Sequence, residues 1–159
     1  MKVSKPIPSA TVLLLRDTAA SVEVFMVTRN AGIDFAGGAL VYPGGKTDPG
    51  DILKPTTGLC DGIENLSPIE IGNRVCAIRE TFEEAGFLLA REKGHGEFVG
   101  GSRCSCIEEE YRNKIHDGTI SMKQLAIKEK LSLACDSLVP FAHWITPRTS
   151  PKRYDTWFY

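Results

Sequence analysis

The chain has 159 residues, of which 42% are hydrophobic and 25% are charged, and its formal net charge at pH 7 is -1. This length suits a single domain, over residues 1–159, with a substantial hydrophobic core. The near balance of charge excludes a strongly basic nucleic-acid-binding surface and a disordered acidic tail, so we expect no nucleic-acid partner.

The N-terminal third of the chain predicts short strands and glycine-rich loops. The runs SATVLLLRD (9–17) and VEVFMVTRN (22–30) are apolar and β-branched, which predicts an antiparallel strand pair. The apolar part of the first run is too short to span a membrane and does not resemble a signal peptide, so we expect no membrane partner. In the glycine-rich segment 31–51, we expect a strand at ALVY (39–42) and loops elsewhere.

Residues 67–86 carry the signals of an amphipathic helix. Ser67 is suited to the N-cap position, Pro68 follows it, and Glu70 completes the pattern of a capping box. Gly86 is suited to end the helix. The spacing of the apolar residues predicts a helix from about Pro68 to Ala85 whose buried stripe comprises Ile71, Val75, Ile78 and Phe82.

The remainder of the chain alternates strand and helix patterns. We predict strands at FLLARE (87–92), 137–147 and 153–159, and helices over 106–118 and 121–132. This order indicates a mixed α/β domain. The chain ends on an aromatic run, so we also expect that the natural protein continues beyond it with further C-terminal elements.

The cysteines favour a reducing compartment. There are five, an odd number, and no secretory signal accompanies them, so we expect reduced thiols and a cytoplasmic location. Cys104 and Cys106 lie close together in the sequence, but no second pair with zinc-site spacing follows, so we interpret them as loop thiols. His116 lies in polar sequence and carries little information.

The stretch RETFEEAG (79–86) concentrates acidic residues on the predicted helix. Because each helical residue turns by about 100°, Glu80, Glu83 and Glu84 fall within an arc of roughly 100° and share one face. Like charges at this spacing repel one another, so the cluster requires a positive partner. Carboxylate oxygens suit Mg²⁺ or Mn²⁺, and these ions often bind together with substrate phosphates.

A second interpretation of the cluster needs no metal. Arg79 can pair with Glu83 four residues along, and the three glutamates can form a solvated helix face. The preceding segment YPGGKTDPGD favours the first interpretation. Gly44 and Gly45 allow the backbone to approach a ligand or metal closely, and Lys46 can present a point charge to phosphate.

These residues resemble the box of the Nudix (MutT-like) hydrolases, G-x5-E-x7-R-E-U-x-E-E-x-G-U, in which U is apolar. RETFEEAGF matches the second half at six fixed positions, and PGGK resembles the preceding loop. Asp51 replaces the first glutamate of the box, and Thr81 replaces an apolar residue. Between Asp51 and Arg79 lie 27 residues, where the box has seven, so we expect an insert at about 52–67 that loops out before the helix. Such a split box is similar to a subgroup that includes peroxisomal coenzyme A diphosphatases.

The resemblance implies an α/β/α sandwich with a mixed sheet and a hydrolase that cleaves the pyrophosphate bond of a nucleoside diphosphate linked to another moiety. That moiety is of the coenzyme A, ADP-ribose or dinucleotide type. The implied metal ligands for Mg²⁺ or Mn²⁺ are the Gly44 carbonyl, Glu80, Glu83 and Glu84. A non-catalytic Nudix-like module that binds a nucleotide or a protein is the alternative, and a homodimer is left open.

The resemblance also implies roles within the reaction. Glu80 is a metal ligand or the base that deprotonates water, Glu84 belongs to the catalytic set with it, and Arg79 orients a glutamate. Gly45 and Lys46 are the implied substrate-binding residues. A base outside the box has candidates by residue type alone, which are Glu108, Glu109, Glu110 and Asp136.

Overall fold

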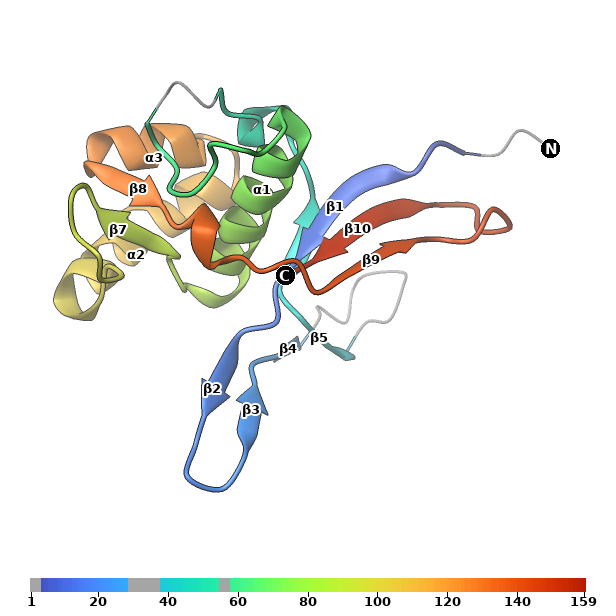
Figure 1. Ribbon diagram of the computed structural model, residues 1–159, viewed down its shortest axis with the longest axis horizontal. Coiled ribbons are helices and arrows are strands. Elements are labelled where there is room, and N and C mark those ends of the chain that lie inside the picture. Colours follow the sequence, from blue (N-terminus) through green and yellow to red (C-terminus); the bar gives the residue numbers. More distant parts are fainter. Residues whose placement is uncertain (1–3, 29–37, 55–57) are drawn as a thin grey trace.

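The computed structural model describes residues 4–28, 38–54 and 58–159 (Figure 1). Its strands are β1 (Ile7–Thr11), β2 (Leu15–Asp17), β3 (Val22–Val24), β4 (Val27–Thr28), β5 (Leu40–Val41), β6 (Gly44–Lys46), β7 (Ala90–Glu92), β8 (Leu131–Leu133), β9 (Ala142–Ile145) and β10 (Tyr154–Phe158). Its helices are α1 (Pro68–Ala85), α2 (Gly101–His116) and α3 (Met122–Lys128), with short 3-10 turns η1 (Pro49–Asp51) and η3 (Cys135–Ser137). The mixed α/β class is confirmed.

A four-stranded mixed sheet with the order β6-β1-β10-β9 positions the candidate site. β1 and β10 run parallel, with Ala10 opposite Trp157, whereas the other neighbours in this sheet are antiparallel. Ala10 also lies opposite Gly45 of β6. Smaller antiparallel pairs form between β2 and β3, β4 and β5, and β7 and β8. Residues that are far apart in the sequence therefore build the sheet that carries the glycine-rich segment.

Helix α1 packs against the sheet through β1 and β6, and α2 packs against α1 (Figure 1). In Figure 1, α1 lies between the four-stranded sheet and the other two helices. The predicted apolar stripe of α1 is fully buried and forms the centre of the core; it comprises Ile71, Val75, Ile78 and Phe82. Within the described residues, no helix combines the length and the apolar composition that crossing a membrane requires.

Both ends of α1 are where the sequence predicts them. The Ser67 side chain accepts a hydrogen bond from the Glu70 N–H, and the Glu70 carboxylate accepts one from the Ser67 N–H, which completes the capping box. Gly86 ends the helix with a φ of 73° and donates its N–H to the Phe82 carbonyl. Local signals therefore determine the helix that carries the acidic residues.

The segment Gly44–Lys46 is a strand, so our prediction of a loop there is wrong. A Cβ on Gly44 would lie 2.4 Å from Thr11 Oγ1, and a Cβ on Gly45 would lie 2.3 Å from Glu80 Oε1. Both distances are far below a normal contact, so a side chain at either position would push β6 away from its neighbours. The glycines allow β6 to lie close to β1 and α1 rather than giving it a loop conformation.

The insert leaves α1 undisturbed, as expected, but its described residues, 52–54 and 58–67, do not loop out from the domain. Its apolar residues Leu53, Leu59, Cys60 and Ile63 are buried. Cys60 forms an isolated parallel bridge with Leu133, and the Asp61 N–H donates to the Leu133 carbonyl. Because apolar side chains are spaced along it, the described part of the insert packs into the core beside β8.

Other elements begin or end at residues different from those predicted, because tertiary pairing overrides the sequence pattern. The first apolar run divides between β1 and β2, and the expected antiparallel pair is confirmed as β2 and β3. Residues 29–37, which include the end of the second run and the first part of the glycine-rich segment 31–51, lie outside the described residues. α2 begins at Gly101 and contains Cys104 and Cys106, so their prediction as loop thiols is wrong. The end of the helix predicted over 121–132 is instead part of β8.

Replacing Gly86 with alanine should lower the free energy of unfolding by about 1–2 kcal/mol, because an L-residue is strained in the left-handed conformation. The new Cβ would also lie 2.3 Å from Glu108 Oε1. Urea unfolding measures the loss. Gly96→Ala is the control, because nothing lies within 4 Å of a Cβ there. An equal effect of both substitutions would contradict this account of the helix end.

Candidate functional site

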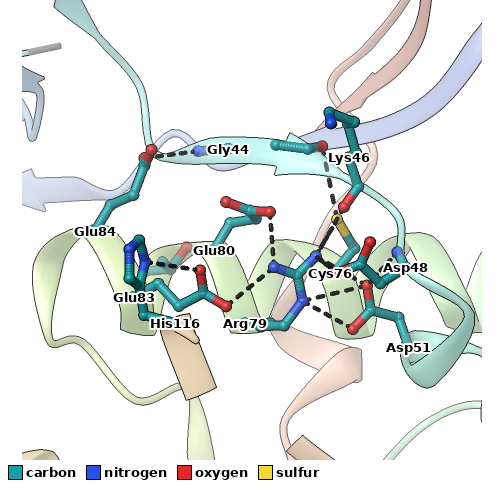
Figure 2. Close-up of polar contacts among 12 residues, drawn as sticks. Gly44, Lys46, Asp48, Asp51, Cys76, Arg79, Glu80, Glu83, Glu84 and His116 are labelled. Carbon is teal, nitrogen blue, oxygen red and sulfur yellow. Dashed lines mark hydrogen bonds and ion pairs between the residues drawn. The ribbon is translucent and has the colours of Figure 1, made fainter. Parts of the chain in front are cut away.

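Glu80, Glu83 and Glu84, which we call the acidic face of α1, lie beside β6 (Figure 2). Glu84 Oε2 accepts a hydrogen bond from the Gly44 N–H at 3.1 Å. The Glu80 carboxylate occupies the space in which a side chain at position 45 would lie. The acidic face is thus held against the Gly44–Gly45 segment, as the proposed chemistry requires. It is the Gly44 N–H that meets Glu84, while the resemblance assigns the Gly44 carbonyl to a metal.

Arg79 joins the acidic face to the loop after β6. It donates from Nη1 to Glu80 Oε1 at 2.8 Å and to Glu83 Oε1 at 3.0 Å, and from Nη2 to the Lys46 carbonyl at 2.7 Å. On its other side Nε lies 3.0 Å from Asp51 Oδ1. The pairing with Glu83 predicted by the metal-free interpretation is therefore present. The side chains of Glu80 and Glu83 are nevertheless only 13% and 10% exposed, so of the three glutamates only Glu84 is exposed to solvent.

Asp51, which replaces the first glutamate of the box, is the buried anchor of Arg79. It is 2% exposed, and its Oδ2 accepts the Asp48 N–H at 2.9 Å as well as the Arg79 Nη2 donor at 3.0 Å. The short 3-10 turn η1 brings the aspartate close enough that its shorter side chain still accepts hydrogen bonds from both Nε and Nη2 of the guanidinium. This departure from the box therefore preserves an acidic contact with Arg79.

Burial dominates the electrostatics of the site. Burial raises the pKa of Glu80 to about 7, and the charges of Glu83 and Glu84 add to this effect, whereas Arg79 opposes it. Burial also raises the pKa of Asp51 against the opposing contact with Arg79. Burial alone would lower the pKa of Arg79, but its hydrogen bond and charge interaction with Asp51 raise it. A glutamate with a pKa near neutrality can exchange a proton at physiological pH.

His116 also belongs to the site, and the sequence did not identify it. Its Nδ1 lies 3.6 Å from Glu83 Oε2, and its side chain is 76% exposed at the C-terminal end of α2. Figure 2 shows the imidazole beside Glu83, on the opposite side from Arg79. The packing of α2 on α1 creates this contact. Sequence spacing gives no signal for it, because the two residues belong to different helices.

Lys46 contributes its backbone to the site rather than its ammonium group. Alternation along β6 places its side chain on the sheet face opposite Gly45, and Figure 2 shows the amine directed away from the carboxylates. Its carbonyl holds Arg79, as described above. Cys76 completes this side of the site, where its Sγ lies 3.7 Å from the Gly45 carbonyl and burial raises its pKa to about 12.

The four acidic residues considered as bases outside the box differ in their surroundings. Glu108 pairs with Arg112, whose Nε donates to the Glu83 carbonyl at 2.9 Å, so this pair borders the site. Asp136 pairs with Arg91 at 2.7 Å, and Glu110 pairs with Lys114. Glu109 is exposed on α2. Contact with the site through Arg112 therefore singles out Glu108.

The donors present fit a hard divalent cation by their chemistry. Glu80, Glu83 and Glu84 supply carboxylate oxygens beside a stretch of glycine backbone, which is the kind of donor set that Mg²⁺ and Mn²⁺ prefer. In the arrangement that the structure describes for residues 4–28, 38–54 and 58–159, no three His, Cys, Asp or Glu side chains converge as a metal-binding group. Arg79 instead supplies the positive charge next to Glu80 and Glu83.

The chain is similar to a known domain family and to two curated proteins. Residues 59–159 match the family model described as the NUDT19 Nudix domain. A protein named acyl-coenzyme A diphosphatase NUDT19 from Xenopus laevis is 23% identical over an alignment of 182 residues, gaps included. The alignment covers 91% of this chain and 48% of that protein. The protein of the same name from Gallus gallus is 34% identical over 107 residues, which cover 58% of this chain and 28% of that protein. The chain thus spans about half or less of the length of these curated relatives.

A solved structure shows the same fold over almost the entire chain. The crystal structure of a Nudix hydrolase from Alicyclobacillus acidocaldarius superposes with a TM-score of 0.76 and 25% sequence identity. The match covers 99% of this chain and 69% of that one. The likeness includes the mixed sheet as well as α1, and so it extends beyond the region covered by the family model.

Removing the carboxylate of Asp51 should be strongly destabilising. Asp51→Ala leaves the buried Arg79 guanidinium without its main partner, so we expect the free energy of unfolding to fall by about 3 kcal/mol or more. Asp48→Ala is the matched control, since Asp48 is 3.8 Å from Arg79 and its side chain is 65% exposed. We expect it to cost less than about 1 kcal/mol. Urea unfolding compares the two, and similar losses would show that Asp51 is not the anchor.

The raised pKa of Glu80 predicts a pH dependence of stability in the metal-free protein. Between about pH 4.5, the ordinary pKa, and about 7, the folded protein keeps the Glu80 proton that the unfolded chain has released. The unfolded state then binds fewer protons, so stability should fall as pH rises through this window, by roughly 1–3 kcal/mol in total.

The contribution of Glu80 is isolated by substitution. Urea unfolding of Glu80→Gln with a chelator present should give a flatter pH dependence across this window, because the amide cannot ionise. Glu109→Gln, on the exposed side of α2, should leave the dependence as it is in the parent. If Glu80→Gln also leaves it unchanged, Glu80 does not titrate in this range.

Proposed function

The chain belongs to the NUDT19 Nudix domain family, and from this premise we propose that it is a Mg²⁺- or Mn²⁺-dependent pyrophosphohydrolase. Its substrate would be a nucleoside diphosphate linked to a second moiety, and the reaction would cleave the bond between the two phosphates. The observation that carries the proposal is the position of the acidic face, which is held beside Gly44 and Gly45 with the carboxylates of Glu80 and Glu83 largely buried and that of Glu84 exposed.

Glu83 and Glu84 would be the principal metal ligands, with Glu80 and the Gly44 carbonyl completing the set contributed by the protein. A bound divalent ion would offset charge on the phosphoryl oxygens and lower the pKa of a water molecule. The glycine backbone at positions 44 and 45 would allow the diphosphate to approach the carboxylates closely, because no Cβ intervenes. The proposal of a metal at this position is supported by the chemistry of these carboxylate and carbonyl oxygens.

The residues around the acidic face would have distinct tasks. Arg79 would fix the orientation of Glu80 and Glu83, because its Nη1 donates to both carboxylates while its Nε donates to Asp51. Glu80 would be either a metal ligand or the base that accepts a proton from water, and burial, which raises its pKa to about 7 in the metal-free protein, favours the second task. Arg79 is therefore a positioning residue, and Glu80 is the candidate base within the box.

The names of two relatives favour one substrate class. Both are acyl-coenzyme A diphosphatases, so we propose a coenzyme A derivative as the first substrate to test, ahead of ADP-ribose and dinucleotides. The single-domain organisation and the cytoplasmic location stay predictions of the sequence. A homodimer stays open in the same way.

Turnover should require both the metal and the acidic face. We expect cleavage of the pyrophosphate bond of acyl-coenzyme A in Mg²⁺ or Mn²⁺, and loss of this activity with a chelator. In Glu83→Gln we expect kcat to fall on the order of 100-fold or more. Glu109→Gln is the control for loss of an exposed glutamate from a helix. The assay is chromatography of the products formed from coenzyme A, acyl-coenzyme A, ADP-ribose and NADH.

A binding module would give a different outcome in the same experiment. Calorimetry that detects tight nucleotide binding, together with no metal-dependent turnover of any substrate, would contradict the proposed enzyme and support a non-catalytic Nudix-like module. Turnover that survives unchanged in Glu83→Gln would instead remove the acidic face from the mechanism.

A further inference from the structure

Three polar side chains of α2 lie against the last turn of α1. Glu108, Arg112 and His116 are spaced by four residues, so they share one side of α2. The Glu108 carboxylate lies beside Gly86, where an added Cβ would be 2.3 Å from Oε1. Arg112 Nε donates a hydrogen bond to the Glu83 carbonyl at 2.9 Å, and His116 Nδ1 lies 3.6 Å from Glu83 Oε2. The hydrogen bond from Arg112 to the backbone of Glu83 therefore brings the next turn of α2 to the carboxylate of the same residue.

Packing fixes the backbone of α2 at His116 but leaves the imidazole in solvent. Tyr111 and Ile115 are buried, so this end of the helix is anchored in the core. The Ile115 carbonyl accepts the Gly118 N–H at 2.9 Å, which closes the last turn. The side chain of His116 is 76% exposed, so it adds little to the core. Stability of the fold therefore does not explain an imidazole at this position.

The two carboxylate oxygens of Glu83 have different neighbours. Oε1 accepts from Arg79 Nη1, whereas Oε2 is the oxygen beside His116, and Figure 2 shows the two basic groups on opposite sides of the carboxylate. Each carboxylate oxygen has two lone pairs, so Oε2 can accept an imidazole N–H and still bind a cation. The distance of 3.6 Å is slightly longer than a hydrogen bond, as is common where contacts tighten on ligand binding. Nδ1 donates in one neutral tautomer of histidine, so the contact requires no added proton.

We propose that His116 is a positioning residue for Glu83, contributed to the metal site by α2. Arg79 holds one oxygen of the carboxylate and His116 holds the other, so Glu83 keeps the orientation in which it can bind the ion. A carboxylate that is already held loses less conformational freedom on binding, and partners of this kind typically change metal affinity by about 10- to 100-fold. The inference rests on the proposed function and adds to it a residue that lies outside the Nudix box.

Manganese binding tests this role without any substrate. In His116→Ala the Kd for Mn²⁺, measured from the electron paramagnetic resonance signal of the free ion, should rise about tenfold or more, because Glu83 is then held on one side only. His95→Ala is the matched control, since it removes another exposed imidazole, from the segment after β7, and should leave the Kd unchanged. The Tm of metal-free His116→Ala should stay within about 2 °C of the parent. A rise in Kd accompanied by a large fall in Tm would show a merely structural role.

Two further substitutions identify which ring nitrogen acts. The amide nitrogen of asparagine lies close to the position of Nδ1 in histidine, whereas that of glutamine reaches closer to the position of Nε2. His116→Asn should therefore keep the Kd for Mn²⁺ within about threefold of the parent, and His116→Gln should resemble His116→Ala. If the imidazole instead contacts the substrate through Nε2, His116→Ala will raise the KM for acyl-coenzyme A without changing the Kd for Mn²⁺, and His116→Gln will restore the KM. That result would overturn the positioning role.

Metal binding and turnover together separate this proposal from the proposed function. If the parent binds Mn²⁺ and the His116 variants behave as described while no substrate is turned over, the hydrolase fails and the role of His116 stands. If the parent hydrolyses a substrate with Mn²⁺ and His116→Ala binds the ion as tightly as the parent does, the role of His116 fails and the hydrolase stands. A parent protein that binds no Mn²⁺ would overturn both.

Discussion

The burial of the Arg79 guanidinium determines the architecture of the site. A buried cation requires anionic partners, and here Asp51 meets it from the η1 turn while Glu80 and Glu83 meet it from α1. The same side chain also binds the Lys46 carbonyl, so it connects the helix, the turn and the strand β6. Glu80 and Glu83 keep their orientation because the Arg79 guanidinium cannot reach water without breaking its contacts with α1, η1 and β6.

Close approach of backbone is the second constraint on the site. Gly44 and Gly45 let β6 lie against both β1 and α1, and the Glu80 carboxylate fills the space that a larger residue would occupy. The result is a narrow region in which carboxylates, glycine backbone and a guanidinium lie together. Such a region concentrates negative charge beside backbone that carries no Cβ.

The accuracy of sequence-based prediction differs between local and tertiary features. Helix α1 was predicted with its correct ends, because Ser67, Glu70 and Gly86 act within a few residues of one another. β6 was missed, since its glycines are explained by neighbours that are distant in sequence. His116 was missed for the same reason, because its contact with Glu83 depends on how α2 packs. Motif spacing predicted which carboxylates share a face and that Arg79 can pair with Glu83, but it could not predict that Glu80 and Asp51 would contact the same guanidinium.

The parallel pairing of β1 with β10 has a consequence for how the protein acquires its structure. β1 begins at residue 7 and β10 ends at residue 158, so this ladder closes nearly the whole chain into one loop. Contacts of such long range form slowly and late, because the entropy of loop closure must be overcome before they stabilise anything. During synthesis, one edge of β1 must therefore stay unpaired until β10 has left the ribosome, and β6 on its other edge gains the support of that pairing only then.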